Sequence, residues 1–480
     1  MPPRRSVSSR ASIAVAAVVV ALVAPVIPAT AQEPTAVTPP GTAAVTQMLS
    51  TPILSARRLP NLLRSRIADA ELAAAVQDVV DQAPETSCLS VTFQGRPVYD
   101  RNEDLPVEPA STNKILTSYA ILQEAGPDER LVTTAVAAAP ADNGVIRGDL
   151  WVVGGGDGML NTAGYRLGLE YPEQPFNEPS VLADRIKAAG ITEITGNIVG
   201  DESRYDDQRE VDSWPDRYRR EDTVGSLSAL VVNRGVTGYA DSPEQTNGTR
   251  LPGDPPLLAA ETFETLLEDR GIRVGGGPAV GPAPTTSTEI ARLESAPIRD
   301  IVAETLGWSD NTTAELLTKE IGVRSSGSGT TAAGTQTTRD LLAAGGFSTE
   351  GLVINDGSGL DVDNRLTCGL LVDLLDSEGL DSEIGAGMAV WGQRGTLRKR
   401  SRGTEIEGRV LAKTGSLTTP PVAALAGWVS TRSGDTVTFA FIQNGTGTDV
   451  GLQDALATAL FEYPQAPTLD VLGPKPPTAA

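Results

Sequence analysis

The sequence predicts an α+β fold, in which helices flank an antiparallel sheet and a large β-rich insertion interrupts the chain. Two observations indicate the sheet: a strand pair follows a helix-like segment near the start, and three strand-like runs precede a helix near the end. A third observation indicates the insertion, because glycine, proline and short strand-like runs dominate residues 131–284. We therefore predict a core domain formed by residues 47–130 and 285–463, an insertion at residues 131–284, and a loose tail at residues 464–480.

The N-terminus has the pattern of a secretory signal peptide. Three arginines precede an apolar run at residues 13–24, and small residues at positions 29 and 31 form a cleavage motif. We expect residues 1–31 to be a signal peptide and residues 32–46, rich in Pro, Thr and Ala, to be a linker. The expected location is outside the cytoplasm: periplasm, cell wall or extracellular space. An uncleaved membrane anchor is the alternative, although the run is shorter than the roughly 20 residues of a span.

The elements on either side of the insertion follow from periodicity and turn residues. Before it, the sequence predicts a helix over residues 64–83, a β-hairpin over residues 88–99, and a second helix that follows Pro109 and ends at Gly126. After it, the expected elements are helices at 297–306 and 312–321, a flexible loop at 325–334, strands at 409–417, 423–430 and 436–443, and a final helix at 449–463.

Within the insertion, strand-like runs at residues 148–153 and 194–201 flank a helix at residues 180–189. The glycines at residues 154–156 resemble a phosphate-binding loop only superficially. No Gly-Lys-[Ser/Thr] follows them, so they predict a tight turn.

Composition excludes several classes of function. The chain has 39 basic and 61 acidic residues, for a net charge of −22, which argues against nucleic acid as a partner and against a basic membrane-surface patch. It has no histidine, so a serine nucleophile could not use a Ser-His-Asp triad. With two cysteines and no ligand spacing for zinc, we predict neither a metal nor a cofactor. Cys88 and Cys368 could form one disulfide in an exported protein or could remain two buried thiols.

Three short motifs point to acyl chemistry through serine. Ser111 precedes Lys114 by three residues at a helix start, which places the hydroxyl and the amine on one face. Lysine is then the available base for a serine nucleophile. Ser309-Asp310-Asn311 comes next, directly before a helix, and Lys413-Thr414-Gly415-Ser416 follows in a strand. Each has an ordinary structural alternative: a capped helix with a solvated lysine, a polar N-cap, and a strand that ends in a turn.

The order Ser-x-x-Lys, Ser-x-Asn, Lys-Thr-Gly is far more specific than any single motif, and it resembles that of β-lactamases and penicillin-binding proteins. The spacing of 198 residues from Ser111 to Ser309 makes the chain most similar to the class C low-molecular-mass penicillin-binding proteins, the D-alanyl-D-alanine carboxypeptidase/endopeptidase family. Residues 148–157, 196–201, 355–360, 395–397 and 426–428 also resemble that family. One departure is Asp361, where the resemblance leads us to expect serine.

The resemblance implies a β-lactamase/transpeptidase-like sheet and a role for each motif. Ser111 would attack the carbonyl of the penultimate D-Ala of a peptidoglycan stem peptide, and Lys114 would act as base with its pKa lowered by burial and by Lys413. Ser309 and Asn311 would relay the proton and hold the substrate amide. Lys413, with the hydroxyls of Thr414 and Ser416, would bind the terminal carboxylate, while the backbone N–H groups of Ser111 and Ser416 would form the oxyanion hole.

The implied activity is therefore that of a serine D,D-carboxypeptidase, with D,D-endopeptidase activity as an addition and β-lactam antibiotics as covalent inhibitors. A β-lactamase with fast deacylation and a non-catalytic cell-wall-binding module are the alternatives. The sequence leaves open the choice between carboxypeptidase and endopeptidase substrates, the role of the insertion, and the oligomeric state.

Overall fold

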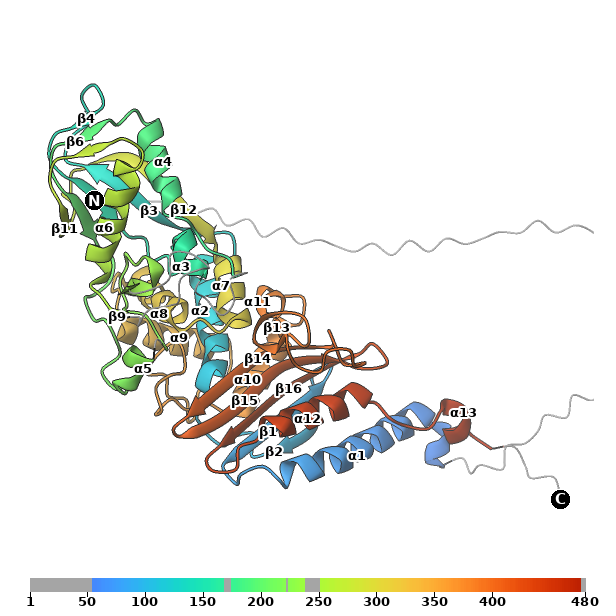
Figure 1. Ribbon diagram of the computed structural model, residues 1–480. Helices are drawn as coiled ribbons and strands as arrows, with labels where there is room; N and C mark the ends of the chain where they lie inside the picture. The colour runs from blue at the N-terminus through green and yellow to red at the C-terminus, as the bar shows by residue number, and fades with distance from the viewer. Residues whose placement is uncertain (1–53, 168–173, 222, 238–250, 476–480) are drawn as a thin grey trace, which may run out of the picture. The chain divides into compact units, whose positions relative to one another are not determined.

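The structure is a computed structural model that describes residues 54–167, 174–221, 223–237 and 251–475 (Figure 1). The expected signal peptide and linker, residues 1–31 and 32–46, lie outside these ranges. Residues Ile53–Pro474 form one compact unit. None of the helices in the described ranges is long and apolar enough to cross a bilayer.

A six-stranded antiparallel sheet organises this unit, as the sequence predicts. Its order is β13-β14-β15-β16-β1-β2, so the N-terminal hairpin joins the C-terminal strands at β1 and β16. The pairing of β15 with β16 is the predicted C-terminal hairpin. The strand bounds are β1 Ser87–Phe93, β2 Arg96–Arg101, β13 Ala389–Val390, β14 Val410–Thr418, β15 Pro421–Ser430 and β16 Thr436–Asn444.

Both faces of the sheet are covered, because alternate residues of its central strands are apolar on each side. On one face Leu89, Leu425 and Phe439 pack with α1 (Pro60–Val80) and α12 (Val450–Glu462). On the other, Ala426 and Ile442 pack with the larger helical layer (Figure 1). That layer consists of α2 (Lys114–Ala125), α7 (Ile298–Gly307), α8 (Asn311–Ser326), α9 (Thr331–Ala344), α10 (Cys368–Glu378) and α11 (Glu383–Gly387).

The prediction of a flexible loop over residues 325–334 is wrong. Helix α8 continues to Ser326 and α9 begins at Thr331, so only a four-residue turn separates them. The side chain of Thr330 caps α9 by accepting a hydrogen bond from the backbone N–H of Ala333. The glycines and serines of residues 325–334 indicate a loop in the sequence, yet Gly334 is the residue whose small size lets α9 lie against Thr318 of α8.

The segment between α2 and α7 builds a separate core around a five-stranded sheet, in the order β11-β7-β5-β3-β12, with a three-stranded sheet β10-β6-β4 beside it. The strand-like run at residues 194–201 divides at Gly196 into β6 and β7, which belong to different sheets. Strand β12 pairs with β3 and therefore extends this sheet beyond residue 284, the predicted end of the insertion. The strands and helices are β3 Arg130–Ala137, β4 Val145–Ile146, β5 Leu150–Val153, α3 Ala163–Leu167, α4 Ser180–Ala188, β6 Glu193–Ile194, β7 Ile198–Asp201, α5 Arg217–Arg220, β8 Val236–Thr237, β9 Leu251–Pro252, α6 Pro255–Glu268, β10 Arg273–Val274, β11 Pro278–Val280 and β12 Thr288–Pro297.

Two further features tie distant segments together. Cys88 in β1 and Cys368 at the start of α10 form a disulfide, which decides the alternative that the sequence left open. The expected loose tail contains a short helix, α13 (Leu469–Leu472), because its buried Leu472 packs with the rest of the unit. The guanidinium of Arg57 donates a hydrogen bond to the carbonyl oxygen of Val471 at 2.8 Å.

Candidate active site

The serine and lysine of the first motif lie side by side. Ser111 is in a 3-10 turn, Ala110–Asn113, that runs directly into α2, and Ala110 before it has a positive φ of 46°. A non-glycine residue in this region is strained, and such strain is typical of functional sites. The side chain of Lys114 is fully buried, and its Nζ lies 3.0 Å from Ser111 Oγ.

Two more hydrogen bonds fix the amine of Lys114. Its Nζ donates to Asn311 Oδ1 and to the carbonyl oxygen of Ser358, each at 2.7 Å. Burial lowers the pKa of Lys114 from 10.5 to about 7, against the opposing effect of nearby carboxylates, Asp356 first among them. A neutral amine has two N–H groups for those two acceptors and one lone pair, which is then directed at the Ser111 hydroxyl.

The second motif closes the site from the start of α8. Ser309 has a positive φ of 65°, and the Asp310 side chain caps α8 through the backbone N–H of Thr313 at 2.7 Å. Asn311 accepts from Lys114 and donates from Nδ2 to the carbonyl oxygen of Thr223 at 2.7 Å. The inserted segment therefore helps to orient the Asn311 amide.

The third motif lies on β14, opposite the first. Lys413 is fully buried, and its Nζ donates to Ser309 Oγ at 2.8 Å and to the carbonyl oxygen of Thr414 at 2.7 Å. Burial, and secondarily the charge of Lys114, lowers the pKa of Lys413 well below its ordinary value.

Gly415 permits the close approach of β14 to Ser111. A Cβ at this position would lie 2.9 Å from the Pro109 carbonyl oxygen and 3.1 Å from the Ser111 backbone nitrogen. Any larger residue would push the strand away from the serine.

A cavity of about 480 Å³ opens onto these groups. Four of the predicted site residues line it: Ser111, Ser309, Asn311 and Ser416. Lys114 and Lys413 are buried behind its wall, while Thr414 bonds through its hydroxyl to Thr396 Oγ1 at 2.9 Å. The other lining residues come from the inserted segment, the 355–364 loop and β14: Arg217, Tyr218, Glu221, Thr223, Leu360, Leu417, Thr418 and Thr419.

The family model described as "D-Ala-D-Ala carboxypeptidase 3 (S13) family" matches residues 69–251 and 236–463. The chain belongs to this family. It is a serine-type D-Ala-D-Ala carboxypeptidase, a hydrolase.

Two curated relatives illustrate the similarity. A D-alanyl-D-alanine carboxypeptidase of Actinomadura sp. (strain R39) is 30% identical over 456 residues, which cover 78% of this chain and 80% of that protein. Carboxypeptidase DacB of Mycolicibacterium smegmatis is 29% identical over 487 residues, covering 95% of this chain and 97% of the relative.

Solved structures share the fold. Penicillin-binding protein 4 of Haemophilus influenzae matches with a TM-score of 0.66 at 19% identity, covering 81% of this chain and 99% of that one. A predatory peptidoglycan endopeptidase of Bdellovibrio bacteriovorus matches with a TM-score of 0.52 at 17% identity, covering 79% of this chain and 93% of that one. These similarities confirm the predicted sheet, its flanking helices and the inserted domain.

Two buried carboxylates, Glu315 and Asp356, support the site although no sequence motif indicated them. Glu315 lies one helical turn after Asn311 and accepts hydrogen bonds from the backbone N–H groups of Gly357 and Ser358, the latter at 2.7 Å. It thereby presents the Ser358 carbonyl oxygen to Lys114. Burial, reinforced by the Asp356 carboxylate, raises the pKa of Glu315. The i, i+4 spacing from Asn311 is the signal that could have indicated Glu315.

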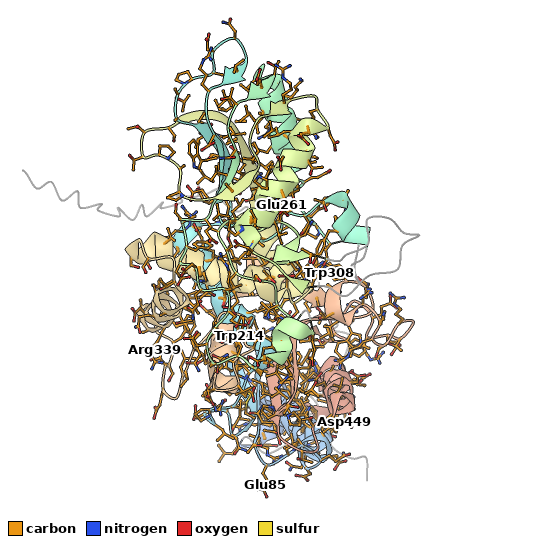
Figure 2. All side chains as sticks on the ribbon, turned by 60° about the vertical axis from the view of Figure 1, so that its left-hand side comes forward. Glu85, Trp214, Glu261, Trp308, Arg339 and Asp449 are labelled. Atoms are coloured by element: carbon orange, nitrogen blue, oxygen red, sulfur yellow. A yellow bond between two sulfur atoms is a disulfide. The ribbon has the colours of Figure 1, made fainter. Side chains whose placement is uncertain are left out.

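Asp356 organises the neighbouring turn. Its carboxylate accepts from the backbone N–H groups of Gly359 and Asp361 at 2.8 and 2.6 Å, and from Trp214 Nε1 at 2.9 Å. Trp214, labelled in Figure 2, belongs to the inserted segment, so this bond joins the insertion to the 355–364 loop. Asp361, the departure from the family pattern, is buried and accepts from Asn355 Nδ2 at 3.1 Å, so it completes the same turn.

No group of three or more Cys, Asp or Glu side chains in the described ranges is arranged to hold a metal ion.

Proposed function

We propose that Ser111 is the nucleophile of this carboxypeptidase and that Lys114 is its general base. The observation that carries the assignment is the environment of the Lys114 amine: full burial, two fixed acceptors, and Ser111 Oγ at 3.0 Å. A pKa near 7 leaves much of this lysine neutral at physiological pH. The neutral amine can then take the proton from Ser111 as the hydroxyl attacks.

The proposed substrate is a peptidoglycan stem peptide that ends in D-Ala-D-Ala. Ser111 attacks the carbonyl carbon of the penultimate D-Ala, and the bond to the terminal D-Ala breaks as the acyl-enzyme forms. Ser309, held by Lys413 Nζ at 2.8 Å, relays to the leaving amine the proton that Lys114 took from Ser111, so D-Ala leaves with a neutral amino group and Lys114 returns to its neutral form. Water then attacks the acyl-enzyme, with Lys114 again as base, and regenerates Ser111.

Charge recognition in this proposal comes from the third motif. The Lys413 amine, whose protonated form a bound carboxylate favours, and the Ser416 hydroxyl at the cavity wall bind the terminal carboxylate of the substrate. The backbone N–H groups of Ser111 and Ser416 bind the oxyanion, and the close contact at Gly415 supports this pairing because it brings β14 against the Ser111 nitrogen.

Two further proposals extend the function. β-Lactams should acylate Ser111, since they present a strained amide and a carboxylate to the same groups; the Haemophilus influenzae protein with this fold has been solved in complex with a β-lactam. The enzyme should work outside the cytoplasm, as the N-terminal signal pattern suggests and as the Cys88–Cys368 disulfide supports.

The test is release of D-Ala from a pentapeptide stem by Lys114→Met and by a matched control, Lys319→Met. Lys319 is also a buried lysine, 1% exposed, but it bonds to Asp206 and to the Gln208 carbonyl oxygen instead of to Ser111. We expect kcat to fall by about 10²–10⁴ in Lys114→Met and to change little in the folded fraction of Lys319→Met. Comparable activity in folded Lys114→Met and wild type would contradict the base assignment.

A further inference from the structure

A patch of exposed leucine and arginine surrounds the start of α1. We define it by residues 54–66, which include η1 (Ala56–Arg58) and the first two turns of α1 (Pro60–Val80), together with α13, which packs beside α1 (Figure 1). Ten large apolar side chains are exposed among the described residues, and five of them belong to this patch. They are Leu54 (98% exposed), Leu59 (62%), Leu62 (57%), Leu469 (41%) and Val471 (51%).

The charge of the patch is opposite to that of the whole chain. Residues 54–66 contain four arginines, at positions 57, 58, 64 and 66, and no acidic residue, whereas the chain carries a net charge of −22. Asp470 of α13 is the acidic residue within the patch, and Asp69, one turn further along α1, is paired with Arg96 at 2.9 Å. The patch therefore keeps a positive excess.

We propose that this patch docks the enzyme on an anionic lipid surface, with the leucines at the acyl boundary and the arginines among the headgroups. Basic side chains beside exposed leucines on a helix are typical of segments that lie in a membrane interface. Arginine can extend its charged end toward phosphate while its aliphatic stem stays in apolar surroundings. The strongly acidic remainder of the chain is repelled by the same surface, so binding would orient the molecule with the patch toward the lipid.

The composition of the patch favours lipid over two other occupants. A second copy on a two-fold axis would place arginines opposite arginines, because such an interface uses the same patch on both subunits. A soluble polyanion would satisfy the arginines but would leave five exposed apolar side chains in water.

The test is co-sedimentation of the full chain with vesicles of phosphatidylcholine containing about 30% phosphatidylglycerol, against vesicles of phosphatidylcholine alone. Because the apolar run at residues 13–24 could bind lipid by itself, every protein in the test carries Val18→Asp and Val20→Asp. One derivative adds Leu59→Ser and Leu62→Ser, and a second adds Arg64→Gln and Arg66→Gln. The matched control adds Val353→Ser and Arg147→Gln, exposed residues outside the patch with 41% and 76% exposed side chains.

We expect binding to the anionic vesicles to exceed binding to the neutral ones, and to weaken at least about tenfold in each patch derivative but not in the control. About 0.5 M salt should weaken it as well. D-Ala release in solution should be equal in all four proteins, so a failed docking proposal stays distinct from a failed assignment of Ser111. Three results would overturn the proposal: equal binding to both kinds of vesicle, unchanged binding of the leucine derivative together with binding to soluble polyphosphate, or a dimer in light scattering that only the patch substitutions dissociate.

Discussion

Acylation of Ser111 should titrate with Lys114. Burial places the pKa of Lys114 at about 7 instead of 10.5. At pH 7 about half of the lysine is then neutral, compared with about three parts in ten thousand for a lysine with the ordinary pKa. In the proposed mechanism the neutral amine accepts the serine proton, so the acylation rate should rise about tenfold from pH 5 to pH 6 and level off above about pH 8.

The assay is single-turnover acylation by benzylpenicillin at subsaturating concentration, followed by intact mass between about pH 5 and pH 9. Thermal unfolding at each pH would show that the fold is intact. The acylation rate of Lys319→Met should have the same pH midpoint as that of wild type. A rate that does not change with pH, or one that still rises steeply at pH 9, would refute the reasoning that burial makes Lys114 a base near neutrality.

Three other changes test individual parts of the site. Glu315→Leu should lower the free energy of unfolding by about 1–3 kcal/mol, because two buried N–H groups lose their acceptor, and should slow acylation; urea unfolding and kcat together check this, and an unchanged kcat would contradict the positioning role. Gly415→Val should reduce kcat at least about 100-fold by displacing β14 from Ser111, whereas Gly277→Ala, with open space at its Cβ, should not; similar activities in steady-state assays would argue against the close approach. Cys368→Ala should destabilise the fold by about 2–5 kcal/mol through loss of the bond to Cys88, measured by denaturant unfolding, and a wild-type midpoint would contradict it.

The core fold was predictable because its signals are local. Apolar alternation in β15 and β16, with a turn between them, defines a hairpin that the structure confirms. The helix that follows Ser111 shows the same agreement between pattern and structure, since Gly126 ends it as predicted.

The structure departs from the sequence predictions where contacts between distant segments stabilise an element that the local sequence does not indicate. Helix α9 contains four threonines and a glycine, residues with poor helix propensity, and packing against α8 stabilises it. Helix α13 depends in the same way on its contact with α1, whose start is distant in sequence. Strand β12 belongs to the inserted sheet because it pairs with β3. The residues of β12 alone do not indicate which distant strand it will pair with.

The three motifs of the site were predictable from the sequence, but the residues of the inserted segment that hold them in place were not. Three motifs identify the residues that the structure brings together around Lys114 and Lys413. The contributions of Thr223 and Trp214 were invisible, because each acts across more than 80 residues of sequence through a single hydrogen bond.

Ser111 is tested most directly as the nucleophile by measuring the mass of the protein after incubation with benzylpenicillin and then identifying the modified peptide. If Ser111 is the nucleophile, one adduct per chain forms on the peptide that contains Ser111, and none forms in Ser111→Ala. An adduct that persists in Ser111→Ala, or a wild-type protein that releases D-Ala while no acyl-enzyme can be trapped, would contradict the proposed nucleophile.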